Sequence, residues 1–320
     1  MSIATAHIGD MVSSRSVTGE ILAELGEEYD DLWVLTPDIG GSLTAFHERF
    51  ADRYVDVGLA EQACVSLAAG LAYDGNIPVV FGMLPFLSMR ALEQIRTDIC
   101  YPNLPVKIVG THGGLVGNGG STHYAVEDLG LMSSLVNMTV TSVGDPVMVA
   151  EVLRQSMDMP GPLYLRMAQG KADRVIYQPG EHDIRIGKGI VTRDGSDVTI
   201  FTHGTTVAQS LDAAEQLADD GLSVRVVDMF TLKPIDAELI ERSAAETGGR
   251  FVVVEDHLAY GGLASRIADV VVDRGIQLTA FERLGIPQVF AGFGSDVELR
   301  DKHGYGLAAT IAAVRRVAAA

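Results

Sequence analysis

Glu61 stands in a setting where a carboxylate could do acid–base chemistry. It follows the strand-like stretch 54–57 and precedes a run of small and apolar residues, 63–72, that has the composition of a helix. The helix dipole favours a carboxylate at this end, so Glu61 could be an ordinary first-turn residue. Residues 63–72 offer no outward polar face, however, and we therefore expect this helix to be buried together with Glu61. A buried carboxylate needs either a partner or a catalytic task.

Two histidines bracket a glycine-rich segment that directly follows a strand-like stretch at 106–109. The segment, 110–123, holds six glycines in its first eleven positions and contains His112 and His123. Glycine lets a backbone come close to a ligand, and ligands of α/β proteins bind at the carboxyl ends of strands. The glycine spacing matches neither GxGxxG nor a P-loop, which disfavours a nucleotide site. Taken alone, the segment is equally compatible with a functional loop and a flexible connection.

The elements around these residues alternate between apolar stretches and amphipathic helical stretches. This alternation predicts an α/β fold with mainly parallel sheets flanked by helices. A chain of 320 residues is long enough for two domains, and a polar stretch with several glycines resembles a linker. We predict domains at 1–175 and 191–320, joined by a linker at 176–190. Strands are predicted at 33–35, 79–81, 106–109, 139–143, 163–165, 198–201, 224–227, 251–254 and 277–281. Helices are predicted at 13–25, 60–72, 88–99, 126–135, 146–157, 207–218, 237–247, 263–274 and 307–317.

The composition is that of an acidic globular protein. Its net charge of −18 repels nucleic acid and anionic membranes, so we expect neither as a partner. No apolar run is long enough to span a bilayer and the N-terminus lacks a signal pattern, which predicts a cytoplasmic protein. Cys64 and Cys100 lie in helical stretches without metal-ligand spacing. We expect buried free thiols and no metal site in this chain.

Several segments, in this order, resemble the transketolase family over nearly the whole chain. The run DVGLAEQ at 56–62, the Pro-Phe-Leu turn at 85–87, RALEQIR at 90–96 and the loop 110–123 resemble its pyrimidine-binding domain. The later DMFTLKPID at 228–236 and VEDH at 254–257 resemble its C-terminal domain. The resemblance implies a thiamine-diphosphate-dependent transferase. It also implies that the two predicted domains are these two.

The resemblance gives Glu61 and Phe86 roles at the cofactor. In the family the glutamate matching Glu61 hydrogen-bonds N1′ of the aminopyrimidine ring and stabilises the imino tautomer that takes the thiazolium C2 proton. That role needs a buried carboxylic acid able to share a proton, which we expect from burial without a cation beside it. Phe86 matches an aromatic residue that stacks on the aminopyrimidine; the alternative is an ordinary core phenylalanine.

Further matching residues are implied to bind the substrate, and two of them, His112 and His123, are implied to be catalytic together with Glu61. His112 resembles a residue near the phosphate-bearing end of a sugar, and His123 one near the donor's C1 hydroxyl and reacting carbonyl. Arg15 and Ser42 match two more phosphate-binding positions, and a guanidinium suits a phosphate because it offers a charged fork of donors. Alternatively, Arg15 is a solvated helix residue and Ser42 a turn residue.

The sequence departs from the family's pattern at two of these sites. Gly119 stands where many relatives have an aspartate that contacts a substrate hydroxyl. Gln169, which we also place at the substrate, stands where relatives usually have a phosphate-binding arginine. Arg166 lies three residues earlier and on a strand would face the opposite side. We therefore expect the anion site to lack one positive charge, and to favour a less charged anion such as a sulfonated sugar, or an unusual sugar phosphate.

A family motif is missing from the sequence. No GDG followed by Asn-Asn, the pattern that holds Mg²⁺ and the cofactor diphosphate in the family, is found, and the chain begins at the pyrimidine-binding domain. We therefore expect a separate diphosphate-binding subunit that holds Mg²⁺, in an α2β2 assembly.

The predicted function is that of the small subunit of a split transketolase, active only with its partner. It would transfer a two-carbon ketol unit from a ketose, as a phosphate or similar anion, to an aldose. The alternatives are the β subunit of a 2-oxoacid dehydrogenase E1 component, a deoxyxylulose phosphate synthase, which is normally a longer single chain, and a non-catalytic regulatory subunit. The paired histidines favour sugar chemistry, and Glu61 favours a catalytic chain. Neither the donor nor the acceptor sugar is specified by these residues.

Overall fold

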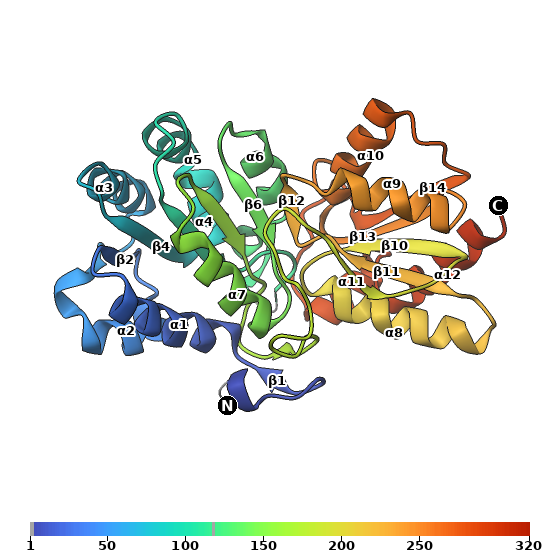
Figure 1. Cartoon of the computed structure of the whole chain (residues 1–320), viewed down its shortest axis with the longest axis horizontal. Coiled ribbons are helices and arrows are strands. Elements are labelled where there is room, and N and C mark those ends of the chain that lie inside the picture. Colours follow the sequence, from blue (N-terminus) through green and yellow to red (C-terminus); the bar gives the residue numbers. More distant parts are fainter. Residues whose placement is uncertain (1–2, 117–118) are drawn as a thin grey trace.

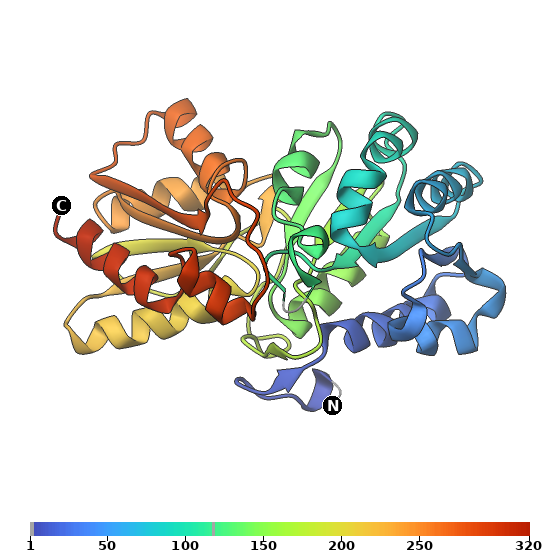
Figure 2. The same ribbon diagram turned by 180° about the vertical axis from the view of Figure 1, so that it is seen from behind.

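The computed structural model describes residues 3–116 and 119–320 and arranges them as two α/β units that lie side by side (Figure 1). The reverse view shows the same division, with most of the chain after residue 190, coloured yellow to red, on one side (Figure 2). Each unit is built on a mainly parallel sheet covered by helices on both faces. The predicted two-domain α/β class is therefore confirmed.

The first sheet has seven strands in the order β12-β6-β7-β5-β4-β2-β3. All neighbouring strands are parallel except β12 and β6. Its central strands are apolar almost throughout because helices cover both faces. The strands are β2 (Leu32–Thr36), β3 (Tyr54–Asp56), β4 (Ile77–Met83), β5 (Lys107–Thr111), β6 (Thr139–Ser142), β7 (Leu163–Arg166) and β12 (Thr231–Lys233).

Helices of the first unit lie in two layers (Figure 1). One face of the sheet carries α3 (Glu61–Tyr73), α4 (Leu84–Arg90) and α6 (Asp128–Ser134), and the other carries α1 (Ser14–Glu28), α2 (Thr44–Arg49) and α7 (Pro146–Met157). The bounds of α7 match the prediction because Asp145 caps its first amides and Pro146 occupies its first turn.

Two expectations about helices of the first unit are wrong. The predicted helix 88–99 is broken into α4, α5 (Leu92–Gln94) and a π-helical turn at Ile95–Cys100. α4 begins earlier than predicted because Pro85 lies in its first turn, where proline favours a helix start. The helix opened by Glu61 is not buried all round, since Ser66 and Leu67 are exposed. Its core contacts come from the other side, at Cys64, Val65 and Ala68.

The second unit has a five-stranded sheet in the order β14-β13-β10-β11-β9, in which only β9 runs antiparallel to its neighbour. Helices α9 (Ala237–Glu246) and α10 (Leu263–Arg274) cover one face, and α8 (Thr206–Asp219) and α12 (Leu307–Ala318) cover the other. The short α11 (Asp296–Lys302) precedes α12. The strands are β9 (Ile190–Arg193), β10 (Val198–Thr202), β11 (Val224–Asp228), β13 (Arg250–Leu258) and β14 (Ala280–Ile286).

The two units share a sheet strand and a buried connection. β12 follows β11 of the second sheet in the chain but pairs with β6 of the first, so one apolar cluster runs through both units. In the connecting segment, Tyr177 donates a 2.7 Å hydrogen bond to Asp228, and burial raises the pKa of Asp228 to about 8. A small antiparallel pair, β1 (Met11–Val12) with β8 (Asp173–Arg174), brings the N-terminal segment against the connection. The boundaries at 175 and 191 stay a prediction.

Within the described ranges, no helix is both long and apolar enough to cross a bilayer. In the same ranges, no cluster of three or more His, Cys, Asp or Glu side chains is placed to hold a metal ion. Cys64 and Cys100 are both buried and free.

Candidate active site

The candidate residues gather at the edge of the first sheet where its parallel strands end. Glu61 begins α3 after β3, Phe86 lies in α4 after β4, and His112 follows β5 directly. Gln169 comes three residues after the end of β7. Because these strands are parallel members of one sheet, their carboxyl ends meet at the same edge, as in other α/β ligand sites.

Glu61 is buried, as expected, but a cation lies beside it. Only 3% of the residue is exposed, and Arg90 donates a 2.6 Å hydrogen bond from Nη1 to Oε2 of Glu61. The expectation of a buried acid without a neighbouring cation is therefore wrong. The reason is that α4 packs against α3 and ends at Arg90, so the last turn of one helix faces the first turn of the other. Half of the Arg90 side chain, 49%, remains exposed.

Phe86 lies between Arg90 and His123. The guanidinium carbon of Arg90 is 4.8 Å from the centroid of the Phe86 ring, which is a cation–π contact. The His123 ring meets Phe86 edge-on, with centroids 5.3 Å apart and an interplanar angle of 80°. Phe86 and Arg90 are four residues apart on α4 and therefore share a helix face. We call Glu61, Phe86, Arg90 and His123 the acid–aromatic cluster.

A second group of candidates surrounds Arg15 in the first turn of α1. Nη2 of Arg15 lies 3.2 Å from Nδ1 of His112 and donates to Oγ1 of Thr111 at 3.1 Å. Its Nε donates to the backbone oxygen of Gln169. The structure thus brings Arg15, His112 and Gln169 together, and we call these three residues the Arg15 cluster. His123 is among the groups whose electrostatic influence lowers the pKa of His112, so the two clusters lie within electrostatic reach of each other.

His112 is a neutral group in this site. Burial lowers its pKa to about 4, and the positive charge of Arg15 acts in the same direction. A neutral imidazole can donate one hydrogen bond and accept another. The backbone of His112 has a φ of 69°, a left-handed conformation that is uncommon outside glycine and is found at functional sites. A neutral His112 can therefore exchange hydrogen bonds with a ligand but adds no charge to the site.

The lowered pKa of His112 predicts a loss of stability in acid. Because the pKa is about 6.5 in an unfolded chain and lower in the folded one, the stabilisation is complete above pH 6.5 and is lost as the pH falls toward 4. Between pH 7 and pH 4 we expect the native protein to lose about 3 kcal/mol more unfolding free energy than a His112→Asn variant. Asparagine tolerates the left-handed backbone. Urea unfolding at both pH values measures this, and parallel losses in the two proteins would contradict a neutral His112.

Ser42 approaches the same helix one turn further on. A Cβ placed on Gly19 would lie 1.9 Å from the backbone oxygen of Ser42, so the 3₁₀ turn Gly40–Leu43 rests directly on α1 there. Gly19 follows Arg15 by four residues and shares its helix face. Among the hydrogen bonds of the described residues, none joins Ser42 to Arg15. Ser42 is therefore near the Arg15 cluster but is not part of it.

The glycine at 119 is linked to the position of His123. A Cβ on Gly119 would lie 2.7 Å from the Cβ of His123, so an aspartate there would require His123 to move. The ring of Phe293, from the second unit, packs closely over Gly120. Gly117 and Asn118, in the same loop, lie outside the described residues. Gly119, which departs from the family pattern, therefore leaves the space that His123 needs in its observed position.

Arg166 and Asp256 form a buried support beneath the histidine loop. Arg166 is 3% exposed, forms a 2.9 Å ion pair with Asp128 and donates to the backbone oxygen of Asp256 at 2.7 Å. It therefore does not replace the arginine missing at position 169. The sequence indicates Asp256 only as part of the VEDH motif and does not predict which residues it contacts.

Asp256 joins the histidine loop to the second unit. Its Oδ1 accepts hydrogen bonds from the backbone N–H of Leu115 at 3.0 Å and from the Tyr305 hydroxyl at 2.9 Å, and its Oδ2 pairs with Arg300 at 2.9 Å. Burial alone would raise the pKa of Asp256, but the charges of Arg300 and Arg166 hold it below its usual value. Asp256 therefore stays ionised and fixes the loop between the two histidines.

Comparisons with known proteins cover both units. Residues 10–173 match the family model for the transketolase pyrimidine binding domain, and residues 187–309 match that for the transketolase C-terminal domain. The chain is 39% identical to a putative transketolase C-terminal section from Methanocaldococcus jannaschii, covering 91% of each chain. It is 31% identical to one subunit of the apulose-4-phosphate transketolase of Phocaeicola vulgatus, over 90% of this chain and 95% of that one.

Longer relatives and a solved structure agree with these matches. The chain is 35% identical to 1-deoxy-D-xylulose-5-phosphate synthase 1 of Geobacter sulfurreducens over 96% of its own length, but it spans only 48% of that protein. It superposes on a split gene transketolase, solved as an inactive β4 tetramer, with a TM-score of 0.88 and 35% identity, covering 96% of this chain and 99% of the other. The chain therefore belongs to the transketolase family, whose pyrimidine-binding and C-terminal domains it contains.

Proposed function

We propose that this chain is the pyrimidine-binding subunit of a two-subunit transketolase that transfers a two-carbon ketol unit between sugars. The acid–aromatic cluster carries the proposal, because it sets a buried carboxylate, an aromatic ring and a histidine together at the ligand-binding edge of the sheet. The nearly full-length matches to a C-terminal section, to one subunit of a transketolase and to a split transketolase support the two-subunit arrangement.

The acid–aromatic cluster fits the aminopyrimidine of thiamine diphosphate, the cofactor that the family implies. Arg90 currently makes two contacts, one with the carboxylate of Glu61 and one with the face of the Phe86 ring. A flat heterocycle with a protonatable nitrogen would use the same two groups, since the acid can share a proton and the ring can stack. The half-exposed Arg90 side chain can turn into water to release them.

The cofactor, when bound, supplies a carbon nucleophile that adds to the ketose carbonyl. In our proposal the carboxyl group of Glu61 holds the proton that is exchanged with the pyrimidine nitrogen. His123, next to Phe86, hydrogen-bonds the donor near its reacting carbonyl. His112 donates or accepts a hydrogen bond in its neutral form, and Arg15 binds the anionic end of the sugar with its permanent charge.

Exposed apolar side chains beside the cluster support a partner that covers it. Leu59 is 78% exposed, Met89 is 50% exposed and Leu67 is 42% exposed, and these residues flank Glu61 and Arg90 in the chain. Exposed apolar residues gathered near one site often mark a contact with another molecule. We propose that the diphosphate-binding subunit lies here, holding Mg²⁺ and the cofactor diphosphate, in an α2β2 assembly.

The β subunit of a 2-oxoacid dehydrogenase would share the fold but would decarboxylate its substrate. The two histidines favour a sugar, because they offer hydrogen bonds at two separate points along a polyhydroxylated chain. A non-catalytic regulatory subunit would have no use for a buried acid beside an aromatic ring at the ligand edge. We therefore favour ketol transfer over both.

Reconstitution tests the proposal. The chain is co-expressed with a diphosphate-domain subunit and assayed with thiamine diphosphate, Mg²⁺ and a panel of ketose donors and aldose acceptors, with 2-oxoacids in parallel. We expect ketol transfer from the mixture and none from either chain alone. Decarboxylation of a 2-oxoacid without ketol transfer would refute ketol transfer as the activity, and full activity from this chain alone would refute the two-subunit proposal.

A further inference from the structure

Lys171 belongs to a segment that wraps around the start of α1. The backbone oxygen of Gly170 accepts hydrogen bonds from the Arg15 N–H at 3.0 Å and from the Ser13 hydroxyl at 2.9 Å. Gly170 has a φ of 69°, and a Cβ there would lie 3.0 Å from Cγ of Arg15. Lys171 therefore directly follows the residue against which Arg15 packs, and Gln169 precedes that residue.

The charge of Lys171 is not neutralised by a neighbour. The side chain is exposed, and in the part of the chain that the structure describes no carboxylate oxygen lies within 4.0 Å of its ammonium nitrogen. The nearby cations differ in this respect. Arg15 is within the field of Asp173, and Arg174 forms a 2.7 Å ion pair with Asp212. Lys171 is thus the uncompensated positive charge of this segment.

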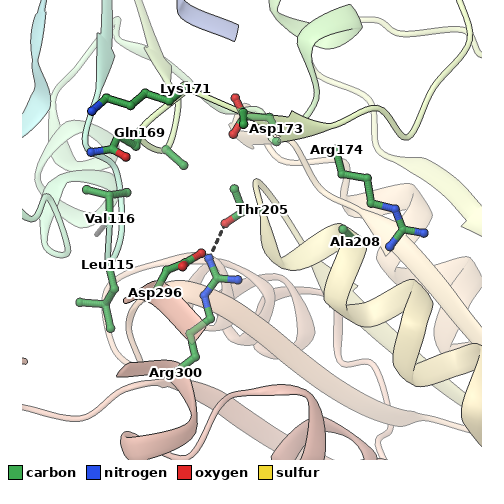
Figure 3. A pocket seen from close by; sticks show the side chains of 14 residues that line it. Leu115, Val116, Gln169, Lys171, Asp173, Arg174, Thr205, Ala208, Asp296 and Arg300 are labelled. Atoms are coloured by element: carbon green, nitrogen blue, oxygen red, sulfur yellow. Dashed lines mark hydrogen bonds between the residues drawn. The ribbon is translucent and has the colours of Figure 1, made fainter. Parts of the chain in front are cut away.

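Lys171 and Gln169, a member of the Arg15 cluster, line the same cavity. In Figure 3, the Lys171 and Gln169 side chains run in the same direction from their common segment, at one side of a cavity of about 340 Å³ between the two units. The charge of Lys171 is also among the causes that lower the pKa of His112, after burial and the charge of Arg15. The ammonium group therefore lies within electrostatic reach of His112.

We propose that Lys171 supplies the positive charge that Gln169 does not, and that it binds the anionic end of the sugar together with Arg15. The proposal rests on the proposed function, since it assigns a specificity residue to the same substrate site. The sequence predicted an anion site that lacks one positive charge. In this proposal the charge is present, but it stands at position 171 instead of 169. A protein with a net charge of −18 repels anions at a distance, so local cations are needed to hold one.

A lysine in this place recognises charge rather than shape. An ammonium group on a flexible stem acts as a point charge, whereas a guanidinium offers a rigid fork that matches two oxygens. An anion site of one arginine and one mobile lysine should therefore accept either a phosphate or a sulfonate at the end of the sugar. The neutral His112 adds one hydrogen bond to either anion.

Kinetics of the assembled enzyme with charged and with neutral donors test the assignment of Lys171. We compare KM for a ketose phosphate with KM for the same ketose without phosphate, in the wild type and in Lys171→Gln, Lys171→Arg and Lys188→Gln. We expect Lys171→Gln to raise KM for the phosphorylated donor by about tenfold, with little change in kcat or in KM for the neutral donor. Lys171→Arg should stay close to the wild type. Lys188→Gln removes the same charge from an exposed linker lysine and should change neither KM.

A second measurement uses inorganic phosphate and this chain alone, so that it does not depend on turnover. The His112 ring resonances are followed by NMR during phosphate titration and during pH titration. In Lys171→Gln we expect the phosphate dissociation constant to rise by about tenfold and the His112 pKa to rise, because a nearby positive charge has been removed. Both should be unchanged in Lys188→Gln.

The two measurements separate failure of this assignment from failure of the proposed function. Absence of ketol transfer in every assembled sample, together with weaker phosphate binding in Lys171→Gln, would refute the proposed function and keep Lys171 as an anion-binding residue. Equal phosphate affinity and equal His112 pKa in wild type and Lys171→Gln would refute the assignment. An equal rise in KM for the charged and the neutral donor would refute it as well.

Discussion

Replacement of Glu61 by glutamine is expected to lower kcat of the assembled enzyme by a factor of about 10² to 10⁴, the usual contribution of a positioned acid–base group. Glutamine keeps the size of the side chain and can still accept a hydrogen bond from Arg90, so the fold should persist. It has no acidic proton to share with the pyrimidine nitrogen. Steady-state kinetics with saturating cofactor, together with circular dichroism of both proteins, measure the effect.

Glu93 provides the matched control for Glu61. It lies on α5 in the same region and is exposed, and Glu93→Gln removes the same charge. We expect this variant to retain kcat within about twofold, as surface substitutions usually perturb little. Wild-type kcat in Glu61→Gln would mean that the buried acid has only a structural role.

Asp256→Ala is expected to produce the largest loss of stability. The substitution leaves the Arg300 guanidinium buried without its partner and frees the backbone N–H of Leu115 and the Tyr305 hydroxyl. Breaking a buried ion pair from one side costs about 3 to 5 kcal/mol. Because the same carboxylate holds the histidine loop, we also expect activity to fall in the protein that remains folded. Denaturant unfolding and kinetics below the transition measure both effects.

Two further variants test the physical reason for this loss. Asp256→Ala combined with Arg300→Met removes both charges, and we expect it to recover part of the lost unfolding free energy because no unpaired charge remains buried. Asp269→Ala breaks an exposed pair with Arg266 and should cost less than about 1 kcal/mol. A double variant less stable than Asp256→Ala would show that the buried pair is not the source of the effect.

Most of the fold could be predicted from the sequence because its local signals agree with its tertiary structure. The apolar runs of the central strands predict strands buried on both faces, and Asp145 and Pro146 fix the start of α7. β12 was missed because three residues carry little periodicity and its partner, β6, belongs to the other unit. The break after α4 was missed because residues 88–99 carry the pattern of one continuous helix.

The sequence predicted which residues form the candidate site, but it did not predict the contacts between them. Glu61 and Phe86 could be named because the family resemblance fixes their positions. Burial of Glu61 was expected from the apolar helix it opens, although only one side of that helix is buried. Arg90 was missed as the partner of Glu61 because the pair joins two helices 29 residues apart, and no local pattern encodes that. The exposed face of α3 was missed for a similar reason. An apolar stretch does not specify whether its own chain or another molecule covers it.

The central claim is that Glu61 of this chain binds the pyrimidine end of a cofactor whose diphosphate is held by another subunit. A structure of the assembled complex with thiamine diphosphate and Mg²⁺ tests it most directly. We predict that the Glu61 carboxyl group lies within hydrogen-bonding distance of N1′, that the pyrimidine faces the Phe86 ring and that Arg90 has turned away from both. A pyrimidine bound elsewhere, with Glu61 still paired to Arg90, would contradict the account.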